Sequence, residues 1–411
     1  MEAFGGHTID FVKRFTESAL RHESRPNPLL SLVEEGYTPQ QIKQAIIEEL
    51  QPFFANRDVL EEHAIETLSG ELVNLAFVTS DARAQAVFDH VRAIYSTAQT
   101  VDATATFRCS AGFEPHIEAG VSEYWSLLYL EIPKGDLELA ELKHEVFRNI
   151  GTLLEACLQP FLREMLGMLR IGRGKSAVES ELLACSLGRV VGELADITHR
   201  EDIYSPLPWG IRLNQWRNVA QHYRSTAIGD LVRIVVGEGG AAKCIELSRD
   251  ELNGVLWLIM LYYRAVKLAR TLFVVDNIRE IGPHLPQFTP RSESIMFAFV
   301  ASVSTQGFRV TDVRTIDGEV QVWLQDLLPE EQPKRMIHAS QLVYALWSRT
   351  DAGIARVHYQ RADGDPFVTF SATAEDCLAL TEERIPMASF VERVLGSAGK
   401  LPDYALRPPS Q

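Results

Sequence analysis

The feature that most constrains the fold is an apolar run over residues 255–275, which three basic side chains interrupt. A membrane-spanning helix needs about 18 or more consecutive apolar residues, and Arg264, Lys267 and Arg270 break the run before that length is reached. Just upstream, Ser248 and Glu251 have the spacing of a capping box, which opens a helix. We therefore expect one long buried helix that ends near residue 276.

The segment upstream also has helical periodicity. Residues 136–171 form a long helical pattern that Pro160 should kink or split, because proline lacks the N–H of the helix ladder. The sequence Gly-Arg-Gly-Lys-Ser at residues 172–176 ends this pattern. Further helices are expected over residues 178–197 and from about Asn214.

A β-hairpin is predicted inside this helical region. Residues 231–236 and 243–247 are two apolar runs that surround a glycine-rich turn. Residues 135–278 are thus expected to form a helical unit with one inserted hairpin, and the whole chain is expected to be mainly α-helical.

Residues 1–134 are expected to form a helical N-terminal region. Thr38 and Gln41 have the spacing of a capping box, with proline between them at the first helical position. Ser80 is interpreted as a second N-cap, before a run of helical periodicity. Residues 101–133 alternate between apolar and polar, which fits either a short strand pair or an irregular helix connection.

Residues 279–290 contain three prolines and a glycine and are interpreted as a linker. Beyond it, residues 291–411 are expected to form a small α+β domain. The expected strands cover residues 295–303, 320–324, 355–359 and 367–370, and the expected helices cover residues 336–347 and 388–395.

Composition narrows the functional classes. The 411 residues include 40 Lys and Arg against 55 Asp and Glu, a formal charge of -15. This balance argues against binding nucleic acid or anionic membrane over the whole surface, so a nucleic-acid site has to be a local basic patch. The five cysteines are scattered without a Cys-x-x-Cys pair, which indicates neither a disulfide framework nor a zinc site. With no apparent secretory signal, a cytoplasmic location is expected.

The residues most indicative of chemistry lie on the helix expected from Asn214. Asn218 and His222 are four residues apart and stack on one helix face, while Arg217 and Arg224 lie two turns apart on its flank. Phosphodiester cleavage without a metal needs a group that exchanges protons near neutral pH, and fixed positive charge, which His and Arg supply. RNA carries its own nucleophile in the ribose 2′-hydroxyl. No metal and no cofactor is therefore expected.

The sequence Arg217-Asn218-Val-Ala-Gln-His222 resembles the motif of the HEPN superfamily, an Arg followed by about four to six residues and then His. The resemblance implies an antiparallel helical bundle and a metal-independent endoribonuclease that acts as a homodimer through the motif helix, as in toxins and phage-defence proteins. By position, Arg217 would bind the scissile phosphate, Asn218 would orient the phosphate or the histidine, and His222 would be the general acid or base. Family toxins commonly have Tyr two residues after the His. Here Tyr223 follows directly, which argues against its modification by an antitoxin.

Local charge also favours an RNA site at this motif. Residues 211–235 contain four arginines against one aspartate, in a chain that is acidic overall. The further side chains expected to contact RNA are Arg212, Trp216, Tyr223, Arg224 and Arg233. The expected partners are RNA, with tRNA among the candidates, a second copy of the chain, and a trigger or inhibitor protein. No membrane partner is expected.

A second interpretation stays open at this point. Arg217 and His222 could be structural, in a non-catalytic helical module that dimerises or binds a partner or nucleotide. Trp216 fits core packing as well as base stacking. His144 lacks the second histidine of a zinc-protease motif and is interpreted as a surface residue, and residues 174–176 are interpreted as a polar loop.

Overall fold

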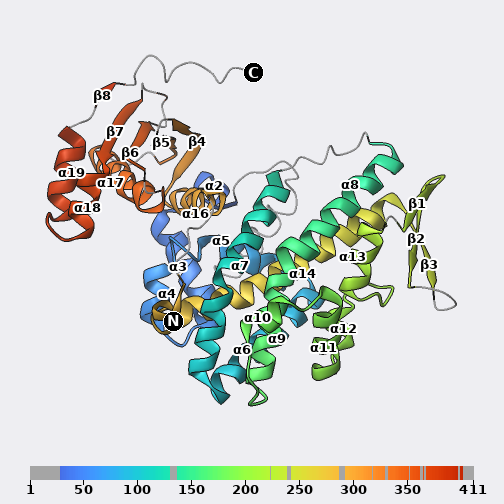
Figure 1. Ribbon diagram of the computed structural model, residues 1–411. Coiled ribbons are helices and arrows are strands. Elements are labelled where there is room, and N and C mark those ends of the chain that lie inside the picture. The colour runs from blue at the N-terminus through green and yellow to red at the C-terminus, as the bar shows by residue number, and fades with distance from the viewer. Residues whose placement is uncertain are drawn as a thin grey trace, which may run out of the picture. The chain divides into compact units, whose positions relative to one another are not determined.

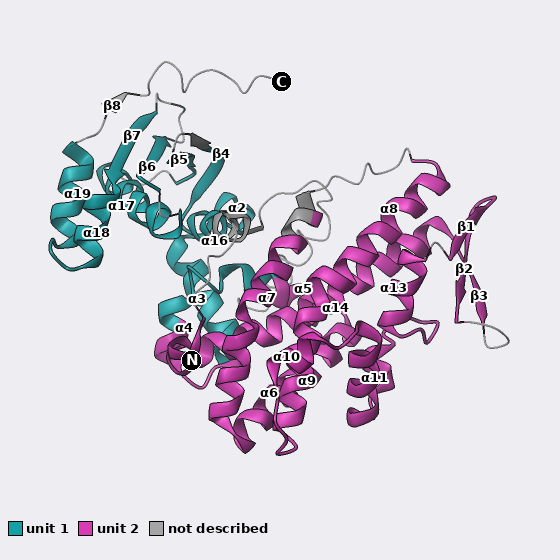
Figure 2. Cartoon of the chain, viewed as in Figure 1, with its two compact units in different colours: residues 1–52, 61–73, 295–411 teal, residues 53–60, 74–294 magenta. Residues whose placement is uncertain are grey.

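The computed structural model describes residues 28–129, 137–222, 224–237, 242–286, 292–316, 318–328, 332–350, 352–361, 364, 367–396 and 399–400. These residues are mainly helical, with one three-stranded and one five-stranded sheet (Figure 1). The chain divides into two compact units (Figure 2). Residues 53–60 and 74–294 belong to the unit that we call the helical unit, and residues 1–52, 61–73 and 295–411 to the α/β unit.

Helix α14 (Arg249–Asp276) is the long buried helix that the sequence predicts. The capping box is confirmed: the Ser248 hydroxyl accepts from the Glu251 N–H, and the Glu251 carboxylate accepts from the Ser248 N–H at 2.8 Å. Buried side chains occupy every face between Leu261 and Val275, including Lys267 and Arg270. The helix therefore lies in the core of the helical unit.

Pro160 splits the long helical pattern, as predicted. Helix α8 (Leu139–Thr152) continues into a π-helical segment, η2 (Leu153–Leu158), and then into α9 (Gln159–Ile171). The Gln159 N–H bonds to a carbonyl five residues back, as in a π-turn. This wider turn gives room to the proline ring, which in a regular α-helix collides with the carbonyl four residues before it.

The single helix expected over residues 178–197 is two helices. Helix α10 (Glu179–Leu183) ends early, and α11 (Leu187–Thr198) begins after it. The reason is Ser186, whose hydroxyl accepts from the Arg189 N–H and caps a new helix start.

The predicted hairpin is confirmed and extended by a third strand. Helix α12 (Glu201–Tyr204) leads to α13 (Leu213–Gln221), which begins where the sequence predicts. Strands β2 (Leu231–Val236) and β3 (Lys243–Leu247) pair antiparallel. A further strand that the sequence did not indicate, β1 (Ser225–Ile228), pairs antiparallel with β2. The sheet therefore follows directly on the end of α13.

Of the two helix N-caps predicted in the N-terminal region, one is confirmed and one is wrong by one residue. They are α2 (Pro28–Glu34), α3 (Pro39–Leu50), α4 (Arg57–His63), α5 (Ser69–Thr79), α6 (Ala82–Val101) and α7 (Ala103–Tyr129), with a short η1 (Gln51–Phe53) after α3, in the helices of this region. The capping box of Thr38 and Gln41 opens α3 as predicted. Helix α6 is capped by Asp81 and not by Ser80, because the Asp81 carboxylate accepts two backbone N–H groups of the first turn.

Helix α7 stands in place of the expected strand pair over residues 101–133, whose last residues lie outside the described ranges. It packs against α6, α9 and η2, so that apolar residues are required on more than one of its faces. Over short windows the resulting distribution of apolar residues resembles the alternation of a strand, which explains why the sequence suggested strands where the structure has a helix.

The α/β unit contains a sheet of order β4-β5-β6-β7-β8. Its elements are α16 (Ser292–Thr305), β4 (Phe308–Ile316), β5 (Glu319–Asp326), α17 (Gln332–Thr350), β6 (Ile354–Gln360), β7 (Val368–Thr373), α18 (Ala374–Thr381), α19 (Met387–Gly396) and β8 (Gly399–Lys400). Strands β5 and β6 are parallel, with α17 as the crossover helix, and the other pairs are antiparallel. The segment expected as a strand over residues 295–303 is helix α16.

The expected linker contains short helices, α15 (Ile278–Ile281) and η4 (Gly282–His284), and its residues 287–290 lie outside the described ranges. Among the residues that the structure describes, no helix has the length and apolar character needed to cross a membrane.

Candidate functional site

Helix α13 carries the motif residues and is anchored by its apolar face. Leu213, Trp216 and Val219 recur every three residues and are buried. Arg217 is partly buried on a flank of the helix, and His222 is the exposed C-cap residue. Burial of the apolar face therefore fixes the positions of the polar ones.

Arg217 is engaged within the protein. Its guanidinium forms an ion pair with Glu155 of η2, and its Nη1 donates to the Asn218 Oδ1 at 3.1 Å. Gln221 donates to the same carboxylate. The side chains of Arg217 and Glu155 are 26% and 30% exposed. A phosphate would have to displace Glu155 from Arg217, because a guanidinium binds carboxylate and phosphate with the same donors.

His222 lines a cavity of about 720 Å³ formed by α8, η2, α13 and β1. Figure 1 shows α8, α13 and β1 at one end of the helical unit, and α8 packs against both of the others. The lining residues are Lys143, His144, Phe147, Arg148, Gly151, Thr152, Glu155, Ala156, Ala220, Gln221, His222 and Ser225. Arg217 and Asn218 lie outside this lining, so the structure brings His222 to the cavity without the other two motif residues.

A second histidine and two basic residues line the same cavity. His144 is exposed on α8. The Lys143 Nζ donates to the Ser225 carbonyl at 3.3 Å, and Arg148 pairs with Glu145 on its own helix. The cavity thus combines two imidazoles with two cations, a set suited to proton transfer beside an anionic group.

The sequence predicts His144 as a surface residue, which its exposure confirms, but it does not assign His144, Lys143 or Arg148 to a site. A signal for them exists, because His144, Arg148 and Glu155 are separated by four and seven residues and therefore lie on one helix face. That spacing shows a polar stripe but does not show what faces it. Only the packing of α8 against α13 makes the stripe one wall of a cavity.

The remaining arginines of the motif region have partners. Arg212 binds Glu201 through Nε and Nη2 at 2.7 and 2.6 Å, and this hydrogen bonding lowers the pKa of Glu201. Arg233 pairs with Glu246 at 2.7 Å. Arg224 donates to the carbonyl that follows β2 at 2.8 Å. The positive charge counted between residues 211 and 235 is therefore partly balanced by carboxylates outside that window.

Trp216 lies in the core of the helical unit, where its side chain is not accessible to a ligand. Its side chain is fully buried, and its ring lies edge to face against that of Trp209, with centroids 5.8 Å apart. This corrects the base-stacking alternative, because a base cannot reach the indole in this arrangement. Tyr223 lies outside the described residues.

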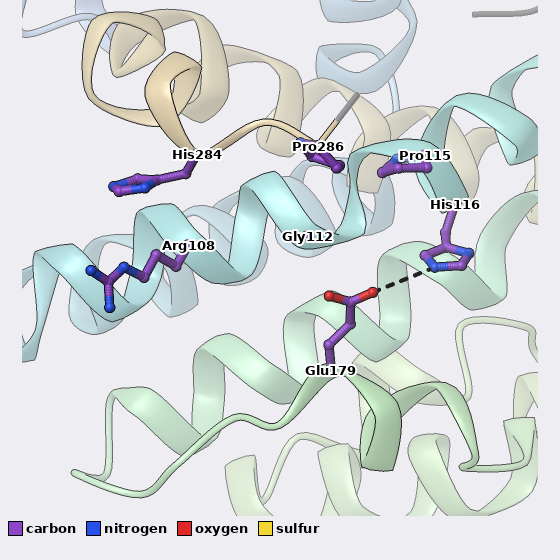
Figure 3. A pocket seen from close by; sticks show the side chains of 7 residues that line it. All are labelled: Arg108, Gly112, Pro115, His116, Glu179, His284 and Pro286. Atoms are coloured by element: carbon purple, nitrogen blue, oxygen red, sulfur yellow. Dashed lines mark ion pairs between the residues drawn. The ribbon is translucent and has the colours of Figure 1, made fainter. Parts of the chain in front are cut away.

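A second cavity, of about 440 Å³, lies elsewhere in the helical unit (Figure 3). His116 Nε2 is 3.7 Å from Glu179 Oε1 at one end, and Arg108 and His284 lie toward the other. Gly112 forms part of the wall, where an added Cβ would lie 2.6 Å from a Glu179 carboxylate oxygen. The ionisable groups of this second cavity lie toward its two ends and do not converge on one point (Figure 3).

Among the described residues, no group of three or more His, Cys, Asp or Glu side chains could hold a metal ion. The chain matches no family model, no curated protein and no solved structure.

Proposed function

We propose that the protein is a metal-independent endoribonuclease that cleaves RNA in the cavity lined by His222. The observation that carries this proposal is that His222 shares a volume of about 720 Å³ with Lys143 and Arg148. An imidazole exchanges protons near neutral pH, and the two cations supply positive charge for a phosphodiester. Because the lining comes from α8, α13 and β1, the packed helical unit holds this set in place.

RNA is the substrate that fits these groups. The ribose 2′-hydroxyl attacks the adjacent phosphorus, so neither a Ser or Cys nucleophile nor a metal ion is needed. The reaction releases a 5′-hydroxyl and leaves a 2′,3′-cyclic phosphate. DNA lacks the 2′-hydroxyl and is expected to remain uncut, which makes it a matched substrate control.

The resemblance of Arg217, Asn218 and His222 to the HEPN motif supports a biological setting. On that basis we place the protein among cytoplasmic toxins or anti-phage effectors, as a homodimer that associates through α13. The same resemblance assigns the scissile phosphate to Arg217, which then has to exchange Glu155 for the phosphate. A monomeric mass at micromolar concentration in sedimentation equilibrium would contradict the dimer.

The test is cleavage of total RNA and of tRNA in EDTA by the wild-type chain and by His222→Ala. His284→Ala is the matched control, because it removes an exposed histidine of the same unit that lines the other cavity. Circular dichroism and thermal melting show whether each variant is folded. We expect wild type and His284→Ala to cut RNA at similar rates, and His222→Ala to lose about 10²- to 10⁴-fold in rate.

A structural role for the motif is the second candidate function, and the ion pair of Arg217 with Glu155 favours it. In that case the helical unit is a non-catalytic module that binds a partner, a nucleotide or a second copy. RNA then remains uncut by every protein, and Arg217→Ala lowers the melting temperature while His222→Ala does not. Cleavage by wild type that His222→Ala abolishes at unchanged stability would exclude this alternative.

A further inference from the structure

We propose that His144 is a second catalytic residue, so that His144 and His222 of one chain form an acid and base pair. This inference rests on the proposed ribonuclease function and names a residue that the motif does not contain. The observation behind it is that both histidines line the same cavity, from different helices of the same unit.

Packing holds the two histidines on fixed supports. His144 lies between Leu142 and Val146 in sequence, and both of these are buried, which anchors its turn of α8. Helices α8 and α13 approach closely, since a Cβ added at Gly151 would lie 3.6 Å from the Ala220 Cβ. His144 is thus carried within α8, and His222 is the C-cap residue of α13, the helix that packs directly against α8.

The charges of the cavity fit an RNA phosphate between the two imidazoles. Lys143 precedes His144 on α8, and Arg148 lies one turn after it and is paired with Glu145, so Arg148 contributes a partly balanced positive charge to the lining. Glu155 is the one carboxylate among the described lining residues, and Arg217 and Gln221 both donate to it. While Arg217 keeps its ion pair with Glu155, it partly neutralises that carboxylate, which reduces the repulsion of a phosphate bound between the two histidines.

Two histidines suffice for both proton transfers of the reaction. The neutral imidazole takes the proton of the ribose 2′-hydroxyl while the new bond from O2′ to phosphorus forms. As the bond from phosphorus to O5′ breaks, the protonated imidazole gives its proton to O5′, the leaving oxygen. The products are a 2′,3′-cyclic phosphate and a 5′-hydroxyl. The first imidazole has gained one proton and the second has lost one, so that atoms and charge balance.

The experiment compares the full-length wild type with His144→Ala, His222→Ala and, as the matched control, His284→Ala. The substrate is an RNA oligonucleotide that wild type cuts, and the readout is kcat/KM from pH 5 to 9. We expect a bell-shaped profile for wild type, because one imidazole must be neutral and the other protonated. We expect His144→Ala to lose at least 10²-fold in kcat/KM and one limb of the profile, and free imidazole to restore part of the loss.

The possible outcomes separate this inference from the proposed function. If wild type cuts and His222→Ala does not, while His144→Ala stays within threefold of wild type with an unchanged profile, His144 is not catalytic and the ribonuclease proposal stands. If wild type does not cut RNA, both fail. Mixing His144→Ala with His222→Ala adds a further test: no recovery of activity supports a pair from one chain, whereas recovery would overturn it by showing that two protomers share the pair.

Discussion

Loss of the buried ion pair at the centre of the helical unit should destabilise it far more than loss of an exposed pair. Arg270 on α14 lies 3.0 Å from Glu164 on α9, and the two side chains are 5% and 0% exposed. Ser110 on α7 donates to Glu164 at 2.9 Å. Arg270 also forms an ion pair with Glu114, so the cluster links α7, α9 and α14.

The change Glu164→Ala leaves Arg270 buried with Glu114 as its remaining carboxylate. Breaking a buried pair by removing one partner costs about 3 to 5 kcal/mol, because the remaining charge keeps its desolvation penalty. Burial raises the pKa of Glu164, against the opposing effect of Arg270. The change Glu164→Gln keeps the volume and an oxygen that can accept from Ser110 or Arg270, so it should be less damaging than Glu164→Ala.

Urea denaturation of the full chain, followed by far-UV circular dichroism, measures the effect. The matched control is Glu246→Ala, which breaks the ion pair with Arg233. The side chains of Arg233 and Glu246 are 47% and 46% exposed. That change should cost at most about 1 kcal/mol. Equal losses for Glu164→Ala and Glu246→Ala would refute the reasoning, since burial would then not set the cost.

Three further predictions concern other parts of the chain. Burial and two neighbouring arginines lower the pKa of His358 to about 4, so its stabilising contribution is complete above about pH 6.5 and falls by about 3 kcal/mol as the pH drops from 6.5 to 4. His358→Gln should flatten the pH dependence of the urea midpoint, and an unchanged slope would contradict this. Ser248→Ala removes the hydroxyl of the α14 capping box and should cost about 1 kcal/mol in the same assay; no change would show that the cap adds nothing. Glu155→Gln removes the charge that competes for Arg217 and should lower the Kd for RNA at low salt, whereas an unaltered Kd would show that Arg217 is not a phosphate ligand.

Local signals in the sequence predicted the elements whose causes are local. The capping box of Ser248 and Glu251 fixed the start of α14, because its two hydrogen bonds join residues three apart. The hairpin of β2 and β3 was equally accessible, since two apolar runs and a turn contain all of its information. Helix α16 was missed, because its run of β-branched and aromatic residues favours a strand locally. In the fold, Phe299 and Val303 are four residues apart and both buried in the core of the α/β unit, which is a helical pattern.

The candidate site divides in the same way. His222 was found from the sequence because its spacing from Arg217 is a property of one helix. His144 is exposed, as the sequence predicts, but nothing within α8 indicates that α13 packs beside it. The arginines were counted as free charge, although their partners Glu155 and Glu201 come from other elements. A charge count over a sequence window misses such partners because they are brought in by tertiary packing.

The cavity forms where two helices stop being regular. On one wall Pro160 follows the π-helical segment that contains Glu155, and on the other α13 ends at His222. The extra residue of a π-turn shifts the phase of the following helix by about 100°. This shift therefore helps to set which side chains of α9 face the core, and Phe161 and Met165 are among those that are fully buried. The π-turn therefore allows the polar stripe of α8 to face the cavity while the apolar side chains of α9 lie in the core. Pro160 follows this turn directly, and the turn leaves room for its ring.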